Sequence, residues 1–186
     1  MSTTSDKPPL PRTTPLAALE TGTDHYRQRM SEIEVRRLEL NWHLFKLGHF
    51  ITVDVDRIAR RFGLSIADIH LLGTIRVNAA TMRANDLAQT LDVSPAALST
   101  RVHRLVEDGL LLRSPHPTDR RAHQLRLTER GAEIADRSTE CLARDTKAVQ
   151  AYARLSSEEL AELTRLLGEL HEAFDRLIVT GAPDIG

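Results

Sequence analysis

The segment 82–128 constrains this chain most, because its cap, stop and turn signals fix the order of several short elements. Residues 82–91 are typical of a short strand that runs into a short helix, and a two-residue turn follows. Ser94 and Pro95 then open a second helix that stops at Gly109, since serine is a good N-cap, proline suits the first helical position, and glycine accepts the left-handed C-cap conformation. Two strands around a Pro/Asp-rich loop come next. Helix, turn, helix and basic hairpin in this order predict a winged helix-turn-helix.

The second helix of this segment has an apolar face and a polar face. Leu98, Val102 and Leu105 form one apolar stripe, which leaves the other positions off the core. A solvated face that is small at its start and basic further along suits insertion into a major groove. The residues that we expect to contact DNA are Ser94, Pro95, Ala96, Ser99, Thr100, Arg101, His103 and Arg104 from this helix, and Asp119, Arg120 and Arg121 from the hairpin.

Several strings of residues in this region point to one protein family. They are Leu87-Ala88, Ser94, Arg101-Val102, Leu105-Val106, Asp108-Gly109-Leu110, Asp119-Arg120-Arg121 and Leu125-x-Leu127-Thr128-x-x-Gly131. In these strings the chain resembles the MarR family of transcriptional regulators, and the resemblance covers about residues 30–178. The Asp-Arg-Arg of the wing followed by Leu-x-Leu-Thr-x-x-Gly is the most specific match. The resemblance implies a mainly α fold with a small β wing, that is, a winged helix-turn-helix with N- and C-terminal dimerisation helices.

These predictions divide the chain into five parts. We expect a disordered or loosely docked tail over 1–22, a dimerisation helix over 23–52, the winged helix-turn-helix DNA-binding region over 53–128, dimerisation helices over 129–178, and a tail over 179–186. The first tail is suggested by its composition, because residues 1–22 hold four of the eight prolines.

Capping signals refine the helix boundaries. A short helix is expected over Val53–Phe62, with Asp54 and Asp56 near its N-terminus, where acids favour the helix dipole, and with Gly63 at its end. Ser65-x-x-Asp68 resembles a capping box and opens the next helix, which turns Ile69, Leu72 and Ile75 inward. After the wing, Thr128 caps a helix that runs to about Arg154, and Ser156-x-x-Glu159 opens the last one.

The last helix carries an apolar repeat with two possible roles. Its large apolar residues recur at three- and four-residue spacing, at Leu160, Leu163, Leu167, Leu170, Phe174 and Leu177. Such a repeat packs either against its own domain or against a second subunit. The family resemblance implies the second role, a homodimer whose two-fold symmetry matches a pseudo-palindromic operator in double-stranded DNA.

Charge is unevenly distributed along the 186 residues. The formal net charge is only −1, yet residues 94–126 hold six arginines against three acids. Local charge governs phosphate binding, so the total does not exclude a nucleic-acid partner. The lone Cys141 excludes an internal disulfide and fits a reducing cytoplasm. Neither an apolar run near 18 residues nor a basic-then-apolar leader occurs, so we expect a cytoplasmic protein with no membrane partner.

Enzymatic and metal-binding patterns are missing from the sequence. The eight histidines show neither H-x₃-H nor HExxH spacing, so we expect no metal site and no cofactor. The chain also has no Gly-x-Ser-x-Gly string, no phosphate-cradling glycine loop and no obvious nucleophile–base pair. We therefore expect no catalytic residues and no enzymatic activity.

Trp42, the only tryptophan, has two possible roles, one in the core and one in a ligand site. It shares one face of the first long helix with Phe45 and His49, where simple core packing is the default. The family resemblance adds a pocket for a small aromatic or phenolic effector, lined by Trp42, Phe45, His49 and His70. One branch of the family, which responds to urate, also has a tryptophan in this helix but an acidic residue where this chain has His70. That departure argues against urate and leaves an aromatic anion open.

Together these observations predict a sequence-specific DNA-binding transcriptional regulator, a repressor rather than an activator. The dimer would occlude a promoter and be released by a small aromatic ligand. An architectural winged-helix protein that binds DNA with little sequence preference is the alternative. A winged helix that binds only protein is disfavoured by the clustered arginines of the wing.

Overall fold

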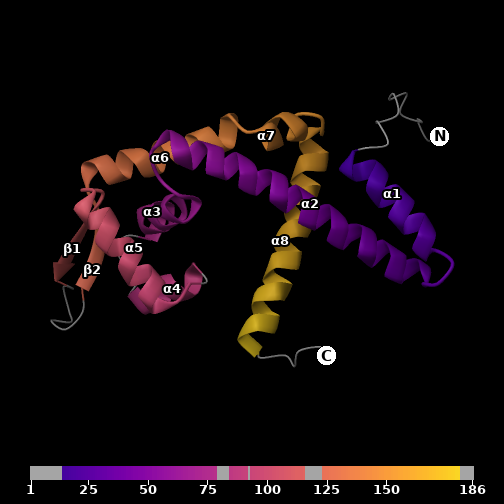
Figure 1. Cartoon of the computed structure of the whole chain (residues 1–186), viewed down its shortest axis with the longest axis horizontal. Coiled ribbons are helices and arrows are strands. Elements are labelled where there is room, and N and C mark those ends of the chain that lie inside the picture. The colour runs from indigo at the N-terminus through magenta and orange to yellow at the C-terminus, as the bar shows by residue number, and fades with distance from the viewer. Residues whose placement is uncertain (1–13, 79–83, 92, 116–122, 181–186) are drawn as a thin grey trace. The chain divides into compact units, whose positions relative to one another are not determined.

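The computed structural model describes residues 14–78, 84–91, 93–115 and 123–180. In chain order its elements are α1 (Pro15–Tyr26), α2 (Glu32–Arg61), α3 (Ile66–Asn78), α4 (Ala84–Thr90), α5 (Pro95–Glu107), β1 (Leu111–Pro115), β2 (His123–Leu127), α6 (Glu129–Arg144), α7 (Lys147–Tyr152) and α8 (Ser157–Thr180) (Figure 1). The fold is mainly helical with a small antiparallel β1-β2 sheet, which confirms the predicted winged helix-turn-helix class. The chain divides into two compact units, residues 1–53 and 54–186.

The first unit contains α1 and the first part of α2. Leu19, Thr23 and Val35 are its buried side chains among the described residues. Ser31 opens α2, because its backbone N–H and its hydroxyl donate to Glu34 at 2.8 and 2.6 Å. These hydrogen bonds hold the pKa of Glu34 below its ordinary value. The sequence suggested a tail over 1–22, but α1 makes part of this segment helical, and residues 1–13 lie outside the described residues.

Helix α2 continues through the point where the sequence suggested a break. The expected helix over Val53–Phe62 is instead the last part of α2, which ends before Gly63 with φ +71°. Asp54 is not an N-terminal acid of a new helix but is buried within α2. It accepts the backbone N–H of Ala148 in α7 at 3.2 Å. Burial raises the pKa of Asp54, but backbone hydrogen bonds from Ala148 and Lys147 together with Arg57 outweigh this and lower it below the ordinary value.

The helix expected from Thr128 to about Arg154 is divided in two. Helix α6 ends at Arg144, and Thr146 caps the short helix α7 by accepting the N–H of Val149 at 3.0 Å. Thr146 is itself buried. The break therefore follows from two caps, one by Thr146 and one by Asp54, that compete with continuation of α6.

The core of the second unit matches the apolar stripes predicted for α3 and α5. Ile69, Leu72 and Ile75 of α3 are buried, which confirms their expected orientation. The main buried cluster also draws on the helix-turn-helix, the wing and α6, and it consists of Leu71, Leu72, Ile75, Leu87, Ala88, Leu98, Val102, Leu105, Leu110, Leu111 and Ala135. The strand expected near residue 82 lies outside the described residues.

The start of α6 is joined to the end of α5 by a tight junction. The Thr128 hydroxyl accepts the N–H of Gly131 at 3.0 Å and donates to the Gly109 carbonyl at 2.8 Å. The Thr128 N–H donates to the Leu110 carbonyl at 3.1 Å. Gly109 has φ +68°, as the predicted left-handed C-cap requires. A Cβ on Gly131 would overlap the Leu110 carbonyl, so the junction admits only glycine at this position.

We expect Gly131→Ala to destabilise the chain by about 1–3 kcal/mol or more, because backbone atoms must move to make room for the methyl group. Gly73→Ala in α3 is the matched control. A Cβ there meets nothing within 4 Å, so the same substitution should be neutral or stabilise by up to about 1 kcal/mol. Urea unfolding of both variants measures the difference. Equal effects of the two substitutions would contradict the close-approach interpretation of Gly131.

Candidate nucleic-acid interface

Helix α5 has the cap and the orientation that the sequence predicts. Ser94 has extended backbone angles, and its hydroxyl accepts the N–H of Ala97 at 3.2 Å. Leu98, Val102 and Leu105 are buried, so the helix is held to the core along one side. Because that side is occupied, the opposite side is the one that a DNA duplex can reach.

The outward side of α5 carries most of the residues expected to read DNA. Ser94, Pro95, Ala96, Ser99, Thr100, His103 and Arg104 are exposed. Thr100 donates from its hydroxyl to the Ala96 carbonyl at 3.1 Å, and His103 Nε2 lies 3.4 Å from Glu107 Oε1. The first part of this surface is small and polar, which allows close approach to base edges.

The two arginines of α5 lie against an acid that the sequence analysis assigned only to capping. Asp68 of α3 is buried, and one oxygen of its carboxylate accepts a hydrogen bond from Nη2 of Arg104. Nε of Arg101 lies 3.9 Å from the same oxygen. The side chain of Arg104 is 54% exposed and that of Arg101 is 26% exposed, so both can still reach solvent. The Ser65-x-x-Asp68 box was the only sequence signal at Asp68, and it indicates a helix cap rather than contacts with arginines.

The wing is described only along its two strands. Leu111 pairs with Leu127 and Leu112 pairs with Arg126 across the antiparallel ladder. Arg113 and Arg126 are exposed. The expected DNA contacts Asp119, Arg120 and Arg121 lie outside the described residues, so their role stays a prediction.

Trp42 is half-buried, with one cationic and one aromatic side chain beside its ring. Its indole Nε1 is buried and has no hydrogen-bond partner among the described residues. The ammonium group of Lys46 lies 4.8 Å from the centroid of the Trp42 ring, and the Phe45 ring centroid lies 6.2 Å away. Lys46 was not predicted from the sequence, although it lies four residues from Trp42 on one helix, a spacing that places two side chains side by side.

The other residues expected around a ligand have separate locations. Phe45 is 64% exposed and His49 is exposed, both in the first unit. His70, which the sequence grouped with Trp42 in one pocket, belongs to the second unit and is exposed on α3. Leu71 and Leu72, which follow His70 along α3, are buried instead. The grouping of His70 with Trp42 in one pocket stays a prediction.

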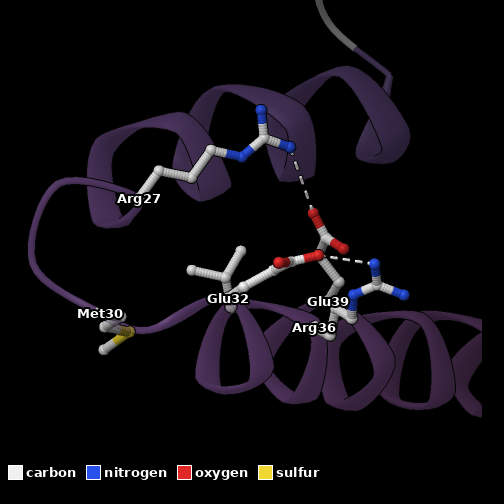
Figure 2. A pocket seen from close by; sticks show the side chains of 6 residues that line it. Arg27, Met30, Glu32, Arg36 and Glu39 are labelled. Carbon is white, nitrogen blue, oxygen red and sulfur yellow. Dashed lines mark hydrogen bonds and ion pairs between the residues drawn. The ribbon is translucent and has the colours of Figure 1, made fainter.

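A cavity of about 480 Å³ in the first unit has a lining of mixed charge. Figure 2 shows Arg27 pointing toward Glu39 and Arg36 toward Glu32. The paired atoms are 3.7 and 2.7 Å apart. Because Arg27 and Arg36 each already face a carboxylate, neither is an unpaired cation for an anionic ligand.

Metal-ligating groups and membrane-spanning helices are both absent from the described residues. No three histidine, cysteine or acidic side chains come together there in a group that could hold a metal ion. None of the described helices is long and apolar enough to cross a membrane.

Known proteins resemble this chain in both sequence and structure. The sequence profile of the MarR family matches residues 62–122. The HTH-type transcriptional regulator PecS of Dickeya dadantii is 24% identical over 149 residues, which are 79% of this chain and 89% of PecS. The multiple antibiotic resistance protein MarR of Escherichia coli is 29% identical over 128 residues, 67% of this chain and 88% of MarR. A crystal structure of a cysteine variant of E. coli MarR with operator DNA superposes with a TM-score of 0.54, at 28% identity, over 68% of this chain and 92% of that one.

The family match covers α3, the helix-turn-helix and β1, and the relatives extend the similarity to further helices on either side. These relatives are transcriptional regulators rather than enzymes. With its helix-turn-helix, its two-stranded wing and its flanking helices, the chain is similar in sequence and fold to the DNA-binding transcriptional regulators of the MarR family.

Proposed function

We propose that this protein is a sequence-specific repressor that binds operator DNA as a homodimer and is released by a small aromatic anion. The observation that carries the proposal is the exposed polar side of α5, held in place by a buried apolar stripe and an N-cap. The solved complex of the E. coli relative contains operator DNA, which supports DNA as the partner of this chain.

The small and polar residues of α5 would recognise the base sequence of the DNA. Ser99, Thr100 and His103 lie on its outward side, and hydroxyl and imidazole groups can hydrogen-bond to base edges. The wing arginines would contribute mainly phosphate or minor-groove contacts, with Asp119 orienting one of them through a charge-assisted bond.

We expect Thr100→Ala and His103→Ala to change which duplexes are selected from a random pool, because a good base contact contributes about 1–3 kcal/mol of discrimination. Arg121→Ala should instead weaken binding to all duplexes and lower the salt slope by about one counterion. Thr164→Ala, which removes an exposed threonine from α8, is the matched control and should change neither property. A pool without an enriched sequence would support the architectural alternative and contradict sequence-specific repression.

The exposed apolar surface of α8 supports the homodimer. Every side chain from Ser157 to Ile178 is exposed except Leu170, which is half-buried. The exposed apolar residues include Leu160, Leu163, Leu167, Phe174 and Leu177. Burying one leucine stabilises an interface by about 1.5–3 kcal/mol, and exposed apolar patches mark interaction surfaces. A second copy of this helix would cover the patch and set two α5 helices about 34–36 Å apart, one duplex turn.

We expect Leu167→Lys combined with Leu170→Lys to give a monomer that no longer binds operator, because unpaired charge at an apolar interface is costly. Thr164→Lys combined with His171→Lys adds the same number of lysines outside the apolar repeat and should stay dimeric. Sedimentation velocity and melting of both double variants distinguish dissociation from misfolding. A folded Leu167/Leu170 variant that remains a dimer would contradict an interface formed by α8.

The surroundings of Trp42 support an aromatic anion as the effector. A ligand acceptor would satisfy the buried indole N–H, which has no partner in the part of the chain that the structure describes. An unsatisfied buried donor costs about 1–3 kcal/mol. Lys46 adds a positive charge beside the ring, and Trp42 and Phe45 add stacking area. A ligand releases DNA only if it binds one arrangement of the dimer better than the other.

We expect aromatic carboxylates or phenols to quench the fluorescence of Trp42 and to release DNA. Trp42→Ala and His70→Ala should blunt ligand-induced release. Trp42→Phe keeps the aromatic packing but removes the N–H, so it separates hydrogen bonding from core packing, with melting measured alongside. A broad ligand panel that neither quenches Trp42 nor releases DNA would show that Trp42 is a core residue.

A further inference from the structure

One buried carboxylate joins α3, the helix before the helix-turn-helix, to α5. We infer that Asp68 is a positioning residue for DNA recognition, which orients the guanidinium groups of Arg101 and Arg104 and thereby controls discrimination between DNA sequences. This inference rests on the proposed function, because it concerns the same DNA-reading helix.

Both oxygens of the Asp68 carboxylate have partners. Oδ2 accepts the N–H and the hydroxyl of Ser65 at 2.8 and 2.6 Å. Oδ1 accepts Nη2 of Arg104 and lies 3.9 Å from Nε of Arg101. The side chain of Asp68 is only 2% exposed. Because rotation of the carboxylate would break the cap or the arginine contacts, Asp68 is a fixed acceptor.

A fixed acceptor restricts how the two arginines can meet DNA. A guanidinium has five N–H donors, so Arg104 can keep one on Asp68 while others reach a phosphate or a base edge. An arginine that is already oriented loses less side-chain entropy when it binds. Asp68 therefore favours one geometry of contact, and that geometry fits some sequences better than others.

The same carboxylate also removes one positive charge from the DNA-facing surface. Binding to random DNA depends on the number of phosphates neutralised, whereas specific binding also depends on the orientation of the reading groups. Loss of the Asp68 charge should therefore weaken the specific complex without weakening the complex with random DNA. A residue with only a stabilising role would weaken both.

The test compares the full-length Asp68→Asn variant with the wild type on two duplexes. One duplex is selected by the wild type from a random pool, and the other is a scrambled duplex of the same composition. Asparagine keeps the size of the side chain and one oxygen for the Ser65 N–H. We expect the ratio of affinities, selected over scrambled, to fall by about tenfold, with affinity for the scrambled duplex unchanged or higher.

Two further variants serve as controls, and a third tests the arginine itself. Asp136→Asn breaks the paired contacts of Arg76 with Asp136, at 2.8 and 3.0 Å between α3 and α6, and should leave the ratio unchanged. Asp68→Glu keeps the negative charge and is a frequent acid in capping boxes, so it should restore most of the ratio. Arg104→Lys keeps the charge but removes the planar fork, and it should lower the ratio even if Asp68→Asn folds poorly.

Each outcome supports or contradicts the positioning role of Asp68. An unchanged ratio in folded Asp68→Asn or in Arg104→Lys overturns the positioning role, and so does a parallel loss of affinity for both duplexes. A wild type that selects no sequence contradicts the proposed function and this inference together. A wild type that selects a sequence, with variants that discriminate equally well, contradicts this inference alone.

Discussion

The close approach of α6 to the residues that follow α5 is the contact on which the DNA-reading part of the molecule depends. Gly131 lies where no side chain fits against the Leu110 carbonyl, and Thr128 bonds to both Gly109 and Leu110. Leu110 and Ala135 are buried in the same core as the inward side of α5. One junction therefore sets where α5 ends, where β1 begins and how α6 leaves the wing.

Signals that lie within one turn of chain predicted most of this fold. The caps at Ser65, Ser94, Thr128 and Ser156 all form the hydrogen bonds that their spacing suggested. Both stop glycines, Gly63 and Gly109, have positive φ. A cap and a stop each depend on residues three or four positions apart, and apolar periodicity depends on a single helix. Caps, stops and apolar periodicity can therefore be predicted without knowing which other helices or strands pack nearby.

The features that the sequence analysis missed depend on residues far apart in the chain. Asp54 looked like an acid at a helix start, but its partner is the N–H of Ala148, 94 positions later. Asp68 looked like a cap alone, but it also holds Arg104, 36 positions later. In both cases one carboxylate serves two elements, and a pattern read within one helix reports only the nearer partner. The first of these contacts is one of the two caps, with that of Thr146, that favour the break after α6.

The second contact changes how the charge of the DNA-facing surface should be counted. Residues 94–126 hold six arginines against three acids, but Asp68, outside that range, lies against two of the six. Helix α5 therefore brings less net charge to a duplex than its own residues suggest. The other four arginines are Arg113, Arg120, Arg121 and Arg126. Arg113 and Arg126 are exposed on the wing strands, so the wing adds positive charge for phosphate attraction, while Asp68 leaves α5 to read bases with oriented donors.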